Sequence, residues 1–285
     1  MAVSETTRAP AQARCQVWGI LNVTPDSFSD GGLFNTADAA ITHGLRLAEQ
    51  GADVVDVGGE STRPGAEPVE PGVEVERVLP VVEALTAAGV TVSIDTMRAR
   101  TARAAMDAGA RIVNDVSGGL ADPDMARIVA ELEVDFVAMH WRAHSTHMDK
   151  RDRYTDVVAE VRDELAARVE ALTSAGVAPE RLILDPGLGF AKVTDSNWPL
   201  LAHMDAWSGG HRVLIGASRK RFLGAVIARE GEEAPPPPER EHATTAVTAL
   251  ASPAGAWAVR VHDVRAACDA IAVASAWQNA VAGPR

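Results

Sequence analysis

The ten residues AAGVTVSIDT, residues 87–96, contain the unit from which this chain is built. An alanine-rich stretch ends at Gly89, and the apolar run that follows it ends in a polar residue, Asp95. Glycine just past a helix supplies the left-handed position that closes the helix. A short apolar run suits a strand that is buried on both faces. The stretch therefore predicts a helix, a turn and a buried strand.

Four further stretches repeat this design, namely EQGADVVDVGG (49–59), DAGARIVNDV (107–116), SAGVAPERLILDPG (174–187) and PAGAWAVRVHD (253–263). Three less regular apolar runs, QVWGILNV, DFVAMHW and RVLIGAS, complete a set of eight. The eight predicted strands lie at about 16–23, 53–59, 90–96, 112–116, 135–141, 182–187, 213–218 and 257–263. Helical patterns separate them, at about 36–50, 73–88, 98–108, 122–133, 155–175, 195–207, 219–230, 240–252 and 264–281. Eight alternating units in 285 residues predict a (β/α)8 TIM barrel, a single domain over residues 15–285. An open doubly wound sheet is the alternative.

Composition narrows the class of protein. A hydrophobic content of 47% supports a sizeable core, and a net charge of −12 disfavours nucleic acid and anionic membranes as partners. Residues 1–14 lack an apolar segment and are predicted to be a flexible tail rather than a signal peptide. The two cysteines, Cys15 and Cys268, cannot form a disulfide framework, which favours a reducing, cytoplasmic location.

Every predicted strand carries a polar residue near its end. These residues are Asn22, Asp56, Asp95, Asn114 with Asp115, His140, Asp185, Ser218, and Arg260 with His262. In a barrel the carboxyl ends of all strands meet at one rim, so we expect these side chains to surround a single site.

Strand ends in any α/β protein also become polar as they reach solvent. For Asp56 or His140 taken alone, that explanation is the favoured one. It fits less well for the whole set, because Arg260 and His262 alternate with apolar residues and so share one face of their strand.

The rim residues divide into two chemical groups. Asp95, Asn114 and Asp185 offer acceptors for a heterocycle rich in N–H donors, whereas Lys220, Arg260 and His262 suit phosphate oxygens.

Two long loops with glycine and proline, 24–35 and 60–72, are predicted to be lids over the site, with surface insertions as the alternative.

Long motifs in the same order resemble those of the bacterial dihydropteroate synthase family. They are GILNVTPDSFSDGG, DVGGESTRPGA, SIDTMR, VNDVSGG, MHWR, LDPGLGFAK, GASRKRFLG and VRVHDV, and the resemblance extends over essentially all of residues 16–282. Their length and order make a chance match implausible, unlike a lone short glycine pattern.

The resemblance implies an enzyme that joins 6-hydroxymethyl-7,8-dihydropterin diphosphate to p-aminobenzoate, and it implies a role for each site residue. The pterin would contact Asp95, Asn114, Val116, Met139, Asp185 and Lys220. The diphosphate would contact Asn22, Ser61, Arg260 and His262, with Asn22 also binding Mg²⁺. The p-aminobenzoate would contact Phe28, Thr62, Arg63, Pro64, Phe190, Lys220 and Arg221. Asp95, Lys220, Phe28 and Asp30 would act in catalysis, and the family resemblance also implies a homodimer.

Other functions on this fold remain alternatives. A pterin-dependent methyltransferase shares the aspartate and asparagine pocket, but its substrate has no diphosphate to match Arg260 and His262. A non-catalytic pterin-binding paralogue is a second alternative. It is disfavoured because the motifs of both predicted lid loops, 24–35 and 60–72, are fully retained. A Schiff-base aldolase is a weaker one, because Lys220 lies beyond its strand rather than within it.

Overall fold

The protein is described from a computed structural model, which covers residues 14–24, 33–60, 69–142, 153–192 and 195–283. Most of the predicted N-terminal tail, residues 1–13, lies outside these described residues, as do parts of both predicted lid loops.

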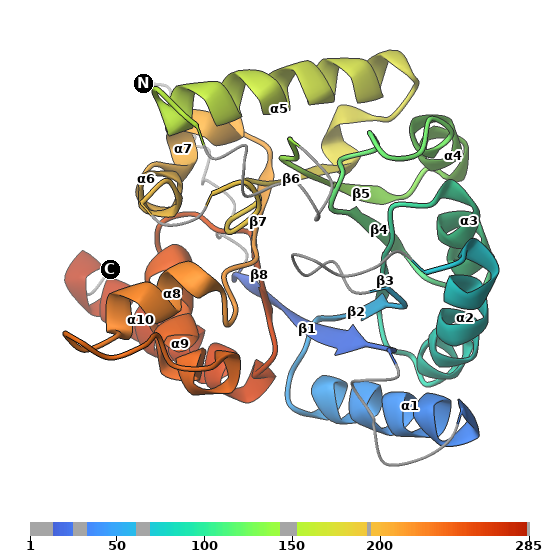
Figure 1. The fold of residues 1–285 in the computed structure, drawn as a ribbon, viewed down its shortest axis with the longest axis horizontal. Coiled ribbons are helices and arrows are strands. Elements are labelled where there is room, and N and C mark those ends of the chain that lie inside the picture. The colour runs from blue at the N-terminus through green and yellow to red at the C-terminus, as the bar shows by residue number, and fades with distance from the viewer. Residues whose placement is uncertain (1–13, 25–32, 61–68, 143–152, 193–194, 284–285) are drawn as a thin grey trace, which may run out of the picture.

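Eight parallel strands close into a barrel in sequence order, with helices packed around it (Figure 1). The strands are β1 (Gln16–Asn22), β2 (Val54–Gly58), β3 (Val92–Asp95), β4 (Ile112–Asp115), β5 (Asp135–Met139), β6 (Leu182–Asp185), β7 (Arg212–Ile215) and β8 (Ala258–Val261). The helices are α1 (Leu33–Glu49), α2 (Pro71–Ala87), α3 (Ala99–Asp107), α4 (Met125–Leu132), α5 (Val157–Ser174), α6 (Asn197–Ala202), α7 (Met204–Ser208), α8 (Arg221–Ile227), α9 (Glu241–Ala251) and α10 (Val264–Ala282). The (β/α)8 prediction is confirmed, and the open sheet is wrong because β1 pairs with β8.

The barrel interior has an apolar layer below and a polar layer above it. Alternate residues of each strand point inward, and the lower ones form a separate buried cluster of Trp18, Val54, Ile112, Val137, Ile183, Leu214 and Ala258. Two residues further along the strands, the inward positions are Asp56, Asn114, Asp185 and Arg260. The apolar layer therefore forms the floor of a polar cup at the carboxyl ends of the strands.

Two helices differ from the sequence-based expectation. The presence of Pro80 predicts a helix that kinks there or begins later, but α2 begins at Pro71 and includes Pro80. Proline suits the first turn of a helix, so Pro71 marks the start, and the later start is wrong. The single helix predicted over 195–207 is two short helices, α6 and α7, that meet at His203.

Candidate active site

Arg260, from β8, connects the carboxylates on two other strands of the cup. Its Nε lies 2.5 Å from Oδ2 of Asp56, and its Nη2 lies 2.6 Å from Oδ2 of Asp95. Asn114 donates from Nδ2 to the same Asp56 oxygen at 2.9 Å. Burial opposes charge on the guanidinium, but Asp56 and Asp95 outweigh it and raise the pKa of Arg260. The cup therefore contains a connected network of side chains from four strands.

Asp95 is one of two incompletely satisfied members of this network, together with Asp56, whose Oδ1 is also buried without a partner among the described residues. The Oδ1 atom of Asp95 is buried and has no hydrogen-bond partner among the described residues, and the side chain is only 5% exposed. Burial raises the pKa of Asp95 to about 7, against the opposing effect of Arg260. A buried acceptor without a partner costs free energy unless a ligand or water supplies a donor. Asp95 is therefore suited to bind an N–H group.

On the opposite side of the cup, Lys220 lies close to Asp185. Asp185 accepts a hydrogen bond from the backbone N–H of Gly187 at 2.7 Å, and burial raises its pKa. Burial lowers the pKa of Lys220 to about 8, although Asp185 opposes this shift. Lys220 also donates to the carbonyl of Leu188, and its Nζ lies 4.6 Å from the centre of the Phe190 ring. This side offers a cation next to an aromatic face.

Two further predicted ligands of the diphosphate, Asn22 and His262, lie at the ends of β1 and β8. Oγ of Ser218 lies 2.8 Å from Nδ1 of His262, which fixes the orientation of the imidazole. Asn22 is the last residue of β1, is partly buried, and has no side-chain hydrogen bond among the described residues. Its amide oxygen is therefore available to a ligand.

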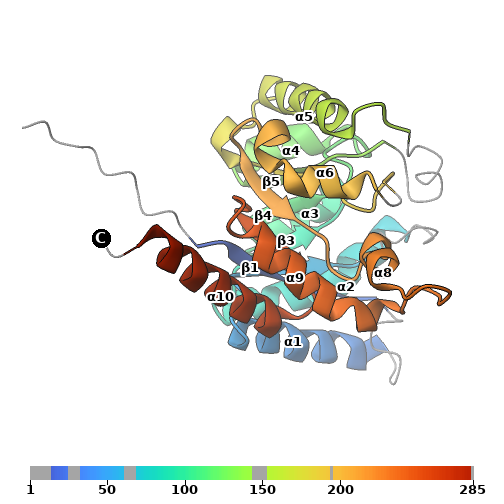
Figure 2. The same cartoon turned by 90° about the vertical axis from the view of Figure 1, so that its left-hand side faces the viewer.

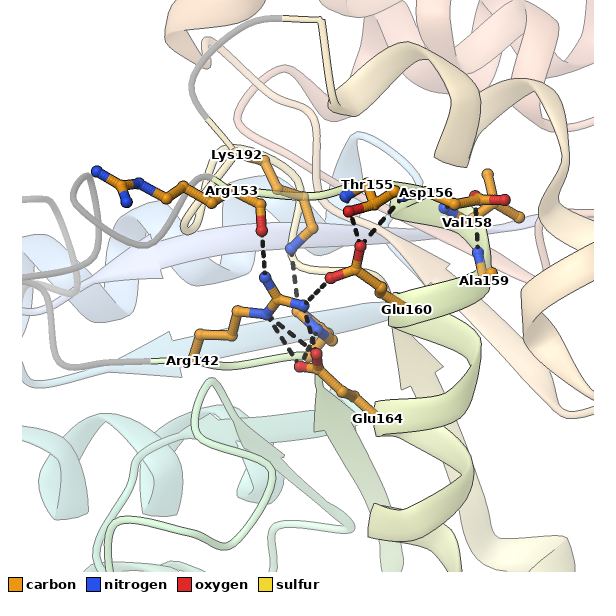
Figure 3. Close-up of polar contacts among 10 residues, drawn as sticks. Arg142, Arg153, Thr155, Asp156, Val158, Ala159, Glu160, Glu164 and Lys192 are labelled. Atoms are coloured by element: carbon orange, nitrogen blue, oxygen red, sulfur yellow. Dashed lines mark hydrogen bonds and ion pairs between the residues drawn. The ribbon is translucent and has the colours of Figure 1, made fainter.

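Behind the cup, a second polar network surrounds Lys192, which is fully buried. It connects the end of β5 to α5 through His140, Glu164 and Arg142, as Figure 3 shows in part. Burial lowers the pKa of Lys192 to about 7. The sequence analysis did not identify this lysine, which belongs to a motif, LDPGLGFAK, that gave no separate signal for it.

Most of the predicted site residues are brought together, and some cannot be placed. Val116 and Met139 are buried at the ends of β4 and β5, and Arg221 is exposed at the start of α8. Six predicted site residues lie outside the described residues: Phe28, Asp30, Ser61, Thr62, Arg63 and Pro64.

Three interpretations of strand-end residues need correction. Asp115 does not face the cup; it accepts hydrogen bonds from the backbone of Ser117 at 2.7 Å and of Gly119 at 2.9 Å, because adjacent strand residues point to opposite faces. Solvation does not explain Asp56 or His140, because both are buried, at 0% and 2% exposure. Each is held by a charged partner that lies far away in the sequence, which no single strand reveals.

The described residues contain no group of three or more His, Cys, Asp or Glu side chains that could hold a metal ion. Magnesium commonly binds through one or two protein oxygens together with water and substrate phosphates. The available amide oxygen of Asn22 fits such an ion when a diphosphate supplies further ligands.

In the part of the chain that the structure describes, no helix has both the length and the apolar character needed to cross a bilayer.

Comparison with known proteins gives the class to which this barrel and cup belong. A family model described as pterin binding enzyme matches residues 18–262. The chain is 54% identical over 275 residues to the dihydropteroate synthase of Mycobacterium leprae (strain TN), covering 96% of each protein. Among solved structures, it is similar to Xanthomonas albilineans dihydropteroate synthase with 4-aminobenzoic acid, with 44% identity, a TM-score of 0.86, and coverage of 96% of this chain and 95% of that chain. The same enzyme in complex with 7,8-dihydropteroate gives 42% identity, a TM-score of 0.83 and 96% coverage of both chains.

The chain belongs to the pterin binding enzyme family. Its activity is that of a dihydropteroate synthase, which makes it a transferase.

Proposed function

We propose that the cup binds 6-hydroxymethyl-7,8-dihydropterin diphosphate and p-aminobenzoate and joins them, with release of diphosphate and 7,8-dihydropteroate. One observation carries this assignment: the buried Oδ1 of Asp95 lacks a donor and lies on a carboxylate that is paired with a cation, Arg260. A flat ring with N–H donors would satisfy the carboxylate, and an anionic group would be attracted to the cation.

The pterin is expected to lie over the apolar floor of the barrel. Asp95, Asn114 and Asp185 surround that position with acceptors and an amide, all of them at most 6% exposed. Val116 and Met139 would pack on the ring. Charge-assisted hydrogen bonds in a dry pocket each contribute about 1.5–3 kcal/mol, so the carboxylates supply both affinity and orientation.

The diphosphate is expected at the ends of β1 and β8. Asn22 and His262 reach this position, and Nη1 of Arg260 has no acceptor among the described residues, so it can donate to a phosphate oxygen. Asn22 would hold Mg²⁺. A bound Mg²⁺ would neutralise the negative charge that grows on the diphosphate as it departs. The role of Ser61 in this group remains a prediction from the sequence.

The p-aminobenzoate is expected beside Lys220 and Phe190, which combine a cation for its carboxylate with a face for its ring. Arg221 begins α8 directly after Lys220. The predicted contacts of Phe28, Thr62, Arg63 and Pro64 remain predictions, because they lie outside the described residues.

The arrangement favours a mechanism in which the carbon–oxygen bond to the diphosphate breaks before the aniline nitrogen attacks. As the carbon–oxygen bond to the diphosphate breaks, positive charge spreads into the pterin, where ionised Asp95 would stabilise it. The aniline nitrogen, a weak base, then attacks the carbon that the diphosphate has left, and the proton that the nitrogen loses is taken up by the released diphosphate. Arg260 contributes to both events, since it contacts Asp95 and retains donors for the anion. Asp30 and Phe28 are proposed to help exclude water.

The direct test incubates the purified protein with the pterin diphosphate, p-aminobenzoate and Mg²⁺. We expect diphosphate release that depends on the aminobenzoate, with 7,8-dihydropteroate identified by mass spectrometry. A methyltransferase or a non-catalytic pterin-binding protein releases no diphosphate under these conditions. Release that is independent of the aminobenzoate, or no release, would overturn the proposal.

The predicted homodimer and cytoplasmic location are also part of this proposal. On α10, Val273, Trp277 and Val281 are exposed at intervals of four residues, at 67%, 74% and 77%, and α10 packs beside α9 (Figure 2). Such a stripe suits burial against a second copy of the chain. Both cysteines are free thiols, as a reducing compartment requires. A Trp277→Glu variant that leaves the size of the particle in light scattering unchanged would contradict this dimer surface.

A further inference from the structure

Lys192 is a fully buried lysine outside the cup, and each N–H of its ammonium group has an acceptor. Its Nζ lies 2.9 Å from Nδ1 of His140, 3.2 Å from the carbonyl oxygen of Gly187 and 3.1 Å from that of Phe190. Burying an isolated ammonium group costs several kcal/mol. An apolar residue such as leucine or methionine would fill the same space without this free-energy cost. The presence of a lysine here therefore suggests that its hydrogen bonds have a role.

The network behind Lys192 keeps the imidazole of His140 in the tautomer whose Nδ1 accepts a hydrogen bond from the lysine. Nε2 of His140 lies 2.9 Å from a carboxylate oxygen of Glu164, so Nε2 carries the hydrogen and Nδ1 is the acceptor. Burial, followed by the charge of Lys192, lowers the pKa of His140 to about 4 and leaves the ring neutral. Arg142 in turn donates from Nε to both oxygens of Glu164 at 3.1 Å and from Nη2 to Glu160 at 2.8 Å (Figure 3).

The segment that Lys192 holds is a tight turn in which two glycines and one alanine have positive φ values. Gly187 and Gly189 have φ values of 67° and 74°, and Ala191 has a φ of 50°, a left-handed conformation that is uncommon for a residue with a side chain. Asn197 binds the same turn, accepting from the N–H of Gly189 at 2.7 Å and donating to the carbonyl of Lys192 at 3.1 Å. A strained turn persists only where its surroundings hold it in place.

This turn supplies two of the contacts that place Lys220 in the cup. The carbonyl of Leu188 accepts a hydrogen bond from Nζ of Lys220, and the ring of Phe190 lies 4.6 Å from the same atom. Lys192 bonds the carbonyls of Gly187 and Phe190, which flank the Leu188 carbonyl in the sequence. A movement of the turn would therefore move both the aromatic face and the acceptor that orient Lys220.

We propose that Lys192 is a positioning residue, whose buried amino group fixes the turn at residues 187–191 so that Phe190 and Lys220 form the binding site for the aromatic amine. The inference rests on the proposed function, because it assigns that side of the cup to p-aminobenzoate. Lys192 makes no contact with substrate; it acts through the turn.

The test compares two variants of the same network. Lys192→Met keeps an unbranched side chain that is one heavy atom shorter and removes all three donors, whereas Glu164→Gln disturbs the far end of the network and leaves the lysine bonded to the turn. We expect Lys192→Met to raise the KM for p-aminobenzoate about tenfold, a change that corresponds to about 1.4 kcal/mol. The KM for the pterin diphosphate should rise by a smaller factor, because the turn also donates to Asp185 through the N–H of Gly187. Glu164→Gln is expected to change both KM values less than twofold.

Hydrogen exchange of the backbone amides at residues 187–191 gives a readout that does not depend on the reaction. Exchange is expected to accelerate in Lys192→Met and to stay unchanged in Glu164→Gln. If Lys192→Met does not fold, Lys192→Gln retains part of the donor set and is expected to show a smaller rise in the same KM.

Two results separate the failure of this inference from the failure of the proposed function. Equal changes in both KM values, or unchanged exchange at residues 187–191, would overturn the positioning role while the wild-type enzyme still makes dihydropteroate. A wild-type protein that makes no dihydropteroate would overturn the proposed function, and the exchange measurement would still decide what Lys192 does to the turn.

Discussion

Two buried networks of charge lie close together in this barrel, and they differ in how completely their hydrogen bonds are satisfied. In the cup, Asp56 and Asp95 share the Arg260 guanidinium, yet each retains a buried carboxylate oxygen without a partner among the described residues. Behind the cup, the three N–H groups of Lys192 each have an acceptor. The incomplete network is prepared for a ligand, whereas the complete one holds backbone in place.

The difference shows that burial of charge alone does not identify an active site. Lys192 and Asp95 are both buried, and burial shifts the pKa of both to about 7. Of these two residues, Asp95 is the one whose side chain has a buried atom without a partner among the described residues. The unsatisfied atoms therefore distinguish the cup network from the Lys192 hydrogen bonds rather than one carboxylate from another, because Asp56 in the cup also retains such an atom.

The variant Asp95→Asn should have the largest effect, because it replaces the charged group that the ligand requires. We expect turnover to fall about 100-fold, which corresponds to about 2.7 kcal/mol of lost stabilisation of the transition state. The protein should remain folded, as judged by circular dichroism. Diphosphate release in the presence of saturating p-aminobenzoate is the measurement, and near-normal turnover would remove Asp95 from the mechanism.

The variant Asp56→Asn tests the supporting half of the cup network. Asp56 is fully buried and accepts from both Arg260 and Asn114, so removal of its charge leaves the guanidinium with one carboxylate partner. We expect the free energy of unfolding in urea to fall by about 2 kcal/mol, below the usual cost of breaking a buried ion pair, because the Arg260 side chain remains 20% exposed. Combining it with Arg260→Gln should cost less than the sum of the two single changes. Strict additivity would mean that the pair does not interact.

The pH dependence of kcat/KM for the pterin diphosphate tests whether ionisation of the cup controls binding. Asp95 has a pKa of about 7 and Lys220 of about 8, so the active form carries an ionised Asp95 and a protonated Lys220. The rate should rise as the pH increases through 7 and should fall about tenfold per unit well above pH 8.

The corresponding effects on stability have opposite signs for these two groups. Burial raises the folded pKa of Asp95 above its usual value, so its contribution to stability is present at acid pH and is lost as the pH rises through about 7. The folded pKa of Lys220 is lowered, so its contribution is present at alkaline pH and is lost as the pH falls through about 8.

The Asp95→Asn variant tests the assignment of the pH dependence of activity. In this variant, the fall in kcat/KM below pH 7 should disappear. A fall that persists in this variant would belong to another group.

Much of the barrel could be predicted from the sequence because its signals are local. The glycine after each helix and the apolar run that follows mark the repeat, and alternation along a strand places Asp95, Asn114 and Asp185 on the inner face. The pairing of Arg260 with Asp56 and Asp95 could not be predicted, because these side chains are separated by 204 and 165 residues in the sequence. Lys192 was missed for a related reason: nothing in its neighbours indicates that a lysine there is buried.

The variant Asp135→Asn should have the smallest effect. It removes an ion pair that lies away from both buried networks and so serves as their control. Asp135 begins β5 at the amino end of the barrel, where it binds Nη1 and Nη2 of Arg212 at 2.9 and 3.0 Å. This pair is complete, like the Lys192 network, but both side chains are more than a quarter exposed and neither is close to the cup. We expect the free energy of unfolding to fall by less than about 1 kcal/mol, as for other solvent-exposed ion pairs, and turnover to remain within twofold. A large loss of turnover with intact folding would show that charge at the amino end of the barrel controls the chemistry at the other end, and the distinction between ligand-binding and supporting networks would then fail.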